Sequence, residues 1–264
     1  MNPKFALIGL IIGFLIGLTG MGGGSLMTPV MILVMGVKPV IAIGTDLAYG
    51  AITKIVGGTS HWRNGTVHRR TALLLSAGSV PATLLGVGLI SRIKHQDPEL
   101  VDGFLLHTLA WVLILVAILM VAKPFITRMA QRGAEREDWR DRAYGYGDSH
   151  PWVLPIVGAI VGFLVGLTSV GSGTLVIVSL LFLYPRWQSK ELVGTDVFHA
   201  ALLVSAASLA QFAVGNVNVP MMLSLLVGSV PGVLLGSRLT LRFPEQMLRL
   251  SLASVLLLSG AKLL

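Results

Sequence analysis

Two glycine-rich stretches flanked by hydroxyl residues, at 19–25 and 168–174, each interrupt an apolar run. Backbone left unpaired inside a membrane is costly unless protein buries it or it lines a wet cavity. If helices restart near Ser25 and Thr174, their first N–H groups carry the positive end of the helix dipole, where anions bind. The breaks therefore predict an anion-binding site, although glycines can also simply allow close helix packing. The predicted site residues are Thr19, Gly20, Gly22, Gly23, Gly24, Ser25, Thr168, Ser169, Gly171, Ser172, Gly173 and Thr174.

Ionisable side chains also occur inside apolar segments. Asp46, Tyr49 and Lys54 follow one helical face, and Asp196 and His199 occupy the places that match Asp46 and Tyr49. Charges in membrane segments are expensive and face a cavity or a partner. A role in anion attraction or proton coupling is one interpretation. The alternatives are that Lys54 forms a structural bridge to Asp46 or Asp196, that the two aspartates cap helices, and that His199 is a packing residue.

The composition predicts a membrane protein. The chain has 264 residues, of which 54% are hydrophobic and 12% charged, and its mean hydropathy is +0.81. The net charge of +8 comes from short basic clusters between apolar runs, which indicate membrane topology and not nucleic-acid binding. Cysteine is absent, so thiolate chemistry and disulfides are excluded. Hydrolase and nucleotide-binding motifs are missing, so neither an enzyme, a cofactor nor a metal site is predicted.

An internal repeat organises the chain. Three blocks recur in order after about 150 residues: IGFLIGLTGMGGGS with VGFLVGLTSVGSGT, GTDLAYG with GTDVFHA, and GSVPATLLG with GSVPGVLLG. Each half has five apolar segments. The predicted divisions are a first membrane repeat (1–122), a charged cytoplasmic linker (123–150) and a second membrane repeat (151–264). The predicted fold is an all-α polytopic membrane protein with two inverted five-segment repeats, containing glycine-broken short helices or re-entrant hairpins.

The inversion follows from segment lengths. A span needs ~20 apolar residues, so the last three segments of each half can cross. The first two are short, and together they return the chain to the side it came from. Three crossings invert the second repeat. With the N-terminus outside, 13 of the 20 Lys and Arg residues fall on the cytoplasmic side, at 61–70, 123–150, 185–191 and 237–245.

The sequence resembles the sulfite exporter TauE/SafE family. The likeness rests on GLTGMGGGSLMTPVMI, IGTDLAYGAITKIVGGTSHWRNGTV, GSVPATLLG and their echoes GLTSVGSGTL, VGTDVFHA and GSVPGVLLGSRL. It implies an inner-membrane carrier with a duplicated helical core that moves sulfite, sulfonates or related small anions in sulfur metabolism. Many members have Thr-Ser-Leu where this chain has Thr45-Asp46-Leu47, a departure that adds a carboxylate.

These observations together predict a secondary transporter of small sulfur oxyanions, driven by a proton gradient and located in the inner (plasma) membrane. Its expected partners are the anion, the lipid bilayer and protons; a homodimer is left open, and nucleic acid is not expected. One alternative is a non-transporting membrane scaffold subunit for a sulfur or redox enzyme. The other is a cation carrier that uses Asp46, Asp196 and His199.

Overall fold

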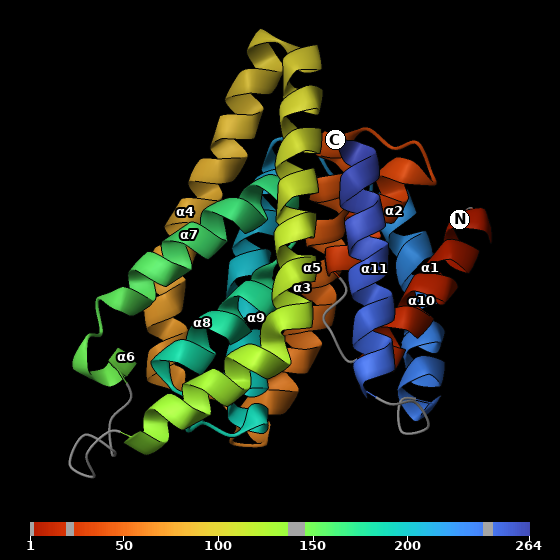
Figure 1. Cartoon of the computed structure of the whole chain (residues 1–264). Coiled ribbons are helices and arrows are strands. Elements are labelled where there is room, and N and C mark those ends of the chain that lie inside the picture. The colour runs from red at the N-terminus through yellow and green to blue at the C-terminus, as the bar shows by residue number, and fades with distance from the viewer. Residues whose placement is uncertain (1–2, 20–23, 137–145, 240–244) are drawn as a thin grey trace.

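The computed structural model describes residues 3–19, 24–136, 146–239 and 245–264, and within these ranges every regular element is a helix (Figure 1). The helices of the first half are α1 (Pro3–Thr19), α2 (Gly24–Leu33), α3 (Pro39–Arg63), α4 (Arg69–Gln96) and α5 (Pro98–Arg136). A short α6 (Tyr146–Ser149) precedes those of the second half: α7 (Val153–Thr168), α8 (Ser172–Leu183), α9 (Ser189–Ala213), α10 (Val219–Leu239) and α11 (Glu245–Leu263). All ten predicted apolar segments are therefore helical.

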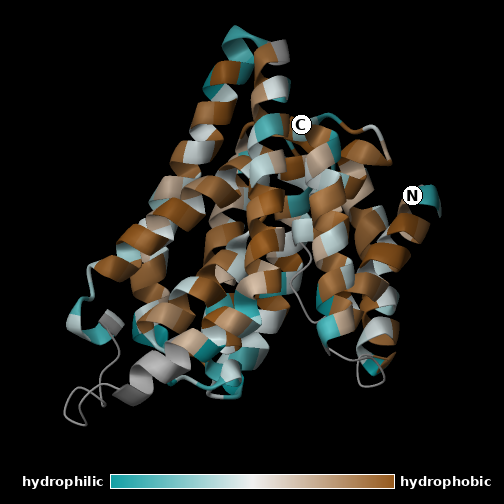
Figure 2. Cartoon of the chain, in the orientation of Figure 1, coloured by the Kyte–Doolittle hydropathy of each residue, from teal (hydrophilic) through white to brown (hydrophobic). Residues whose placement is uncertain are grey.

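Six of the described helices are long and apolar enough to cross a membrane: α3, α4, α5, α9, α10 and α11. Apolar residues dominate their length, and hydrophilic residues gather toward the ends of the molecule (Figure 2). These six are the third, fourth and fifth segments of each half, as predicted. The predicted linker begins inside α5, which continues as a helix from 123 to Arg136. From Arg128 on, this stretch consists of arginine, methionine, alanine, glutamine and glutamate with one glycine, Gly133, and all of these residue types except glycine favour helix.

Glycine stripes join helices from different halves. In α1 the facing pairs are Gly9 with Leu225, Gly13 with Ser229 and Gly17 with Val233, and a Cβ on any of these glycines would overlap the backbone of α10. In α7, Gly158, Gly162 and Gly166 face α4 in the same manner. The residue numbers rise together in both pairs, so each pair is parallel. Small residues let the backbones approach closely, as is typical of membrane helices.

The two halves exchange partners. Helix α1 packs on α10 and its counterpart α7 packs on α4, while α3 packs on its own counterpart α9 and α5 on α11. In the central pair, Gly50 faces Val204 and Gly57 faces Val197, so α3 and α9 are antiparallel. Neither half could bury these faces without the other.

The short helices α7 and α8 form a hairpin. The hydroxyl of Tyr184, directly after α8, contacts a carboxylate oxygen of Asp148 at 3.5 Å, and Asp148 lies in α6, the short helix that precedes α7. The open ends of the hairpin therefore lie together, and its tip, residues 169–171, points into the molecule against α3. The matching turn between α1 and α2 lies outside the described residues.

Candidate functional site

The tip of the α7–α8 hairpin is a true helix break. Ser169 ends α7 with a positive φ of 63°, and Gly171 precedes α8 with a φ of 98°, a conformation that favours glycine. The Thr168 hydroxyl donates to the carbonyl of Leu164 at 2.7 Å and accepts from the N–H of Val170 at 3.2 Å. Thr168 therefore stabilises the turn, and the Ser169 and Ser172 side chains extend from it to α3.

Asp46 joins the hairpin regions of both halves. Its Oδ2 accepts a hydrogen bond from Thr28 of α2 at 2.5 Å and another from Ser169 at 2.9 Å. The side chain is only 1% exposed, and no described residue bonds its Oδ1. Sequence analysis predicted that the two breaks would converge; α2, which starts after the first break, and the tip of the second meet at this carboxylate.

Lys54 lies two turns further along α3, at the start of α8. Its Nζ donates to the Ser172 hydroxyl at 2.7 Å, and Ser172 is the first residue of α8. The next residue, Gly173, lies against Asp196 of α9: a Cβ added to it would be 3.5 Å from Oδ2. Asp196 is 4% exposed, and its Oδ1 has no hydrogen-bond partner in the described part of the chain. An ammonium and a carboxylate therefore both border the first turn of α8.

His199 occupies a separate polar contact one turn after Asp196. Its Nε2 is 2.8 Å from the hydroxyl of Ser79 in α4. The side chain is fully buried, and none of the described residues bonds its Nδ1. The matching residue, Tyr49, lies beside Ser229, which is the counterpart of Ser79. In each half, the serine of the GSVP block therefore contacts the matching position of a central helix: Ser79 contacts His199 of α9, and Ser229 contacts Tyr49 of α3.

The repeated Gly-Thr-Asp block has a divided role. The Thr45 hydroxyl accepts from the N–H of Asn218 at 3.0 Å, and the Thr195 hydroxyl accepts from the N–H of His68 at 3.0 Å. Each threonine thus holds the loop that follows the central helix of the other half. The next residue in each block is a buried aspartate, Asp46 or Asp196. Adjacent residues of one helix therefore hold a loop and place a carboxylate in the core.

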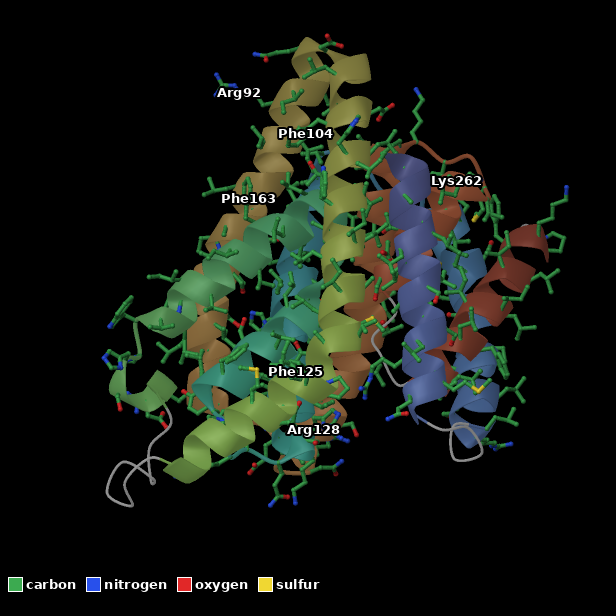
Figure 3. All side chains as sticks on the ribbon, in the orientation of Figure 1. Arg92, Phe104, Phe125, Arg128, Phe163 and Lys262 are labelled. Atoms are coloured by element: carbon green, nitrogen blue, oxygen red, sulfur yellow. The ribbon has the colours of Figure 1, made fainter. Side chains whose placement is uncertain are left out.

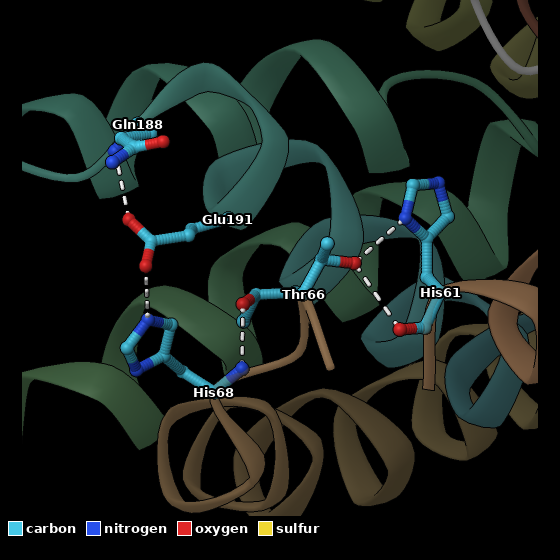
Figure 4. Close-up of polar contacts among 6 residues, drawn as sticks. His61, Thr66, His68, Gln188 and Glu191 are labelled. Carbon is cyan, nitrogen blue, oxygen red and sulfur yellow. Dashed lines mark hydrogen bonds and ion pairs between the residues drawn. The ribbon is translucent and has the colours of Figure 1, made fainter. Parts of the chain in front are cut away.

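The loop at 64–68 is also tied to the start of α9 (Figure 4). His68 Nε2 is 3.4 Å from Glu191, whose other carboxylate oxygen accepts from the Gln188 N–H at 2.8 Å. The His61 ring contacts the Thr66 hydroxyl at 2.9 Å. His61 lies in the last turn of α3, within the predicted basic loop, and His68 directly precedes α4 with its side chain 42% exposed.

The predicted site residues fall into three groups. Around the hairpin tip lie Ser169, Ser172, Gly173, Asp46, Lys54 and Asp196, while Gly171 and Thr168 shape the turn itself. Tyr49 contacts Ser229 and His199 contacts Ser79. Thr19 ends α1, Gly24 begins α2, and Ser25 and Thr174 are half-buried in the first turns of α2 and α8. Gly20, Gly22 and Gly23 lie outside the described residues.

One sequence-based alternative is wrong. Asp46 and Asp196 do not cap helices, because each lies in the second turn or later of a helix whose N-cap is Lys38 or Gln188. Lys54 bonds Ser172, and no ion pair within 4.0 Å joins it to either aspartate in the described part of the chain. Sequence analysis missed Thr28 and Ser79, whose only signal was a hydroxyl one turn into a predicted helix and a repeated GSVP block. Among the described residues, no cluster of His, Asp or Glu could hold a metal ion.

Comparisons with known proteins agree with this architecture. The family model described as "Sulfite exporter TauE/SafE" matches residues 5–263. The chain is 38% identical to the probable membrane transporter protein YjnA of Bacillus subtilis, with all of both chains covered. It is 27% identical to the probable membrane transporter protein YunE of the same organism, over 97% of this chain and 95% of the relative. No solved structure matches.

Proposed function

Because the chain belongs to the sulfite exporter TauE/SafE family, and is a multi-pass membrane transporter and not an enzyme, we propose that it is a secondary carrier of small sulfur oxyanions such as sulfite or sulfonates. The proposed binding site lies between the glycine-rich breaks of the two halves, around Lys54, Ser172 and Gly173. The proposed location is the inner (plasma) membrane.

One observation carries this proposal: the half-buried ammonium of Lys54 is held at the positive end of a helix. Cations are favoured at helix C-termini and disfavoured at N-termini. Lys54 is nevertheless bonded to the first residue of α8. Two positive features that point at the same space recruit an anion, and the Ser172 hydroxyl supplies a further donor. This is the combination that binds oxyanions at helix starts.

The two halves are proposed to be inverted in the membrane. The antiparallel course of α3 and α9 supports this, because two equivalent helices that both cross a bilayer in opposite directions belong to inverted repeats. Arg92 and Lys262 lie toward one end of the molecule and Arg128 lies toward the other, whereas Phe104, Phe125 and Phe163 lie between Arg92 and Arg128 in the view (Figure 3). The predicted topology assigns Arg128 to the cytoplasm and Arg92 and Lys262 to the outside.

Purified protein in liposomes tests the proposal. Uptake of sulfur-labelled sulfite should exceed that of empty liposomes and should be competed by sulfonates but not by cations. Gly173→Val should abolish it, because the added side chain fills the space between α8 and Asp196; Gly88→Val, which projects into open space on α4, is the matched control. Flux equal to empty liposomes for every anion of the panel would refute transport and favour a scaffold role, whereas competition by cations alone would favour a cation carrier.

A further inference from the structure

The two matching aspartates, Asp46 and Asp196, have different surroundings. Asp46 is held by the hydroxyls of Thr28 and Ser169, which come from separate hairpins. No hydroxyl of the described residues bonds Asp196, although its side chain is almost fully buried. Instead its carboxylate lies against Gly173 in the first turn of α8, on the side where Lys54 reaches Ser172. Equivalent sequence positions therefore have unequal roles.

Asp196 occupies the position of an anionic ligand. A carboxylate and a substrate oxyanion are both anions, and both are attracted to a helix N-terminus and to a nearby ammonium. Asp196 therefore lies where such a substrate would bind. Lys54 is in electrostatic range of Asp196. A bound anion and an ionised Asp196 would compete for the same positive features, and together they would leave excess negative charge in a buried site.

We propose that Asp196 is the coupling residue: it is the counter-anion of Lys54 in the empty carrier and takes up one proton when the substrate anion replaces it. This rests on the proposed anion transport. The proton comes from the aqueous phase and bonds to a carboxylate oxygen of Asp196, so a singly charged anion binds without change in the net charge of the site. One proton then moves with each anion, and Asp46 keeps the hairpins together throughout the cycle.

The other groups that face Asp196 are few. Lys54 comes from α3 and Lys123 from α5, while His199 is one turn further along α9. Helices α7 and α8 have no ionisable residue, and those of α4 are confined to its two ends. One ring nitrogen of His199 already contacts Ser79. Asp196 is the carboxylate that lies against the first turn of α8.

The test measures anion binding and proton uptake together. Sulfonates, whose single negative charge does not change in this range, are titrated into the detergent-purified protein by calorimetry between pH 5.5 and 8, in buffers of different ionisation heat. Sulfite, which itself takes up a proton in this range, is titrated at pH 5.5, where it is singly charged. Uptake of one proton predicts that wild-type affinity falls by about tenfold for each pH unit above the carboxylate's titration. Asp196→Asn should remove this dependence and still bind the anion, whereas Asp46→Asn, at the matching position, should retain it. A pH-dependent Asp196→Asn with a pH-independent Asp46→Asn would overturn the assignment.

Three further results separate the possibilities. Anion binding without proton uptake in the wild type refutes this inference and leaves the transporter intact. Binding of no anion at any pH refutes the proposed function, and the inference with it. If Asp196→Asn does not fold, the infrared difference spectrum of the wild type decides: sulfite should produce a protonated-carboxyl band, and its absence would overturn the proposal.

Discussion

Replacing Lys54 by methionine should weaken anion binding with little loss of side-chain volume. An oxyanion that accepts from Nζ has its charge about 4 Å from the ammonium, where the attraction is about 4 kcal/mol at the effective dielectric constant of partly buried sites. Part of this is offset, because Lys54 gives up its attraction to Asp196 when the anion binds. A net loss of about 1.5 to 3 kcal/mol remains, which corresponds to about 10- to 100-fold in Kd.

The assay is sulfite titration by calorimetry at fixed pH and ionic strength, with transport in liposomes as a second measurement. Lys190→Met is the matched control, since Lys190 is exposed in the first turn of α9 and its loss removes the same charge far from Ser172. The control should bind as the wild type does. An unchanged Kd for Lys54→Met, in protein that elutes as one symmetric peak, would refute the placement of the anion at α8.

Three other changes test the architecture. Gly78→Ala should lower the free energy of unfolding by about 1 to 3 kcal/mol, because its Cβ would overlap the backbone of α7, whereas Gly88→Ala on the same helix should stay within about 0.5 kcal/mol; equal melting temperatures in detergent would contradict this. Asp46→Leu leaves two buried hydroxyls without their acceptor at about 1 to 3 kcal/mol each, so its melting temperature should fall well below that of Asp46→Asn, and similar values would argue against the clamp. Cysteines at Asn64 and Val214, both exposed and each beside a glycine with positive φ, should be labelled from opposite sides of the membrane, and labelling from one side would break the inversion.

Sequence alone determined the membrane class, the ten apolar helices and the central ionisable residues. Hydropathy and internal repetition are properties of neighbouring or regularly spaced residues, so they survive without knowledge of contacts. The glycine run at 168–174 and the dipeptide Thr45-Asp46 could be singled out for the same reason. The duplication also led to the prediction that the two breaks converge.

The tertiary structure decided which of these residues meet. Asp46 bonds Thr28, which is 18 positions away, and Ser169, which is 123 positions away. No local sequence pattern gives the register of one helix on another. The exchange of partners between α1 and α10 and between α4 and α7 likewise depends on which glycine stripe fits which backbone. Most of all, two aspartates in identical Gly-Thr-Asp blocks have different neighbours, because a repeat in sequence fixes the position of a side chain on its own helix but not what packs against it.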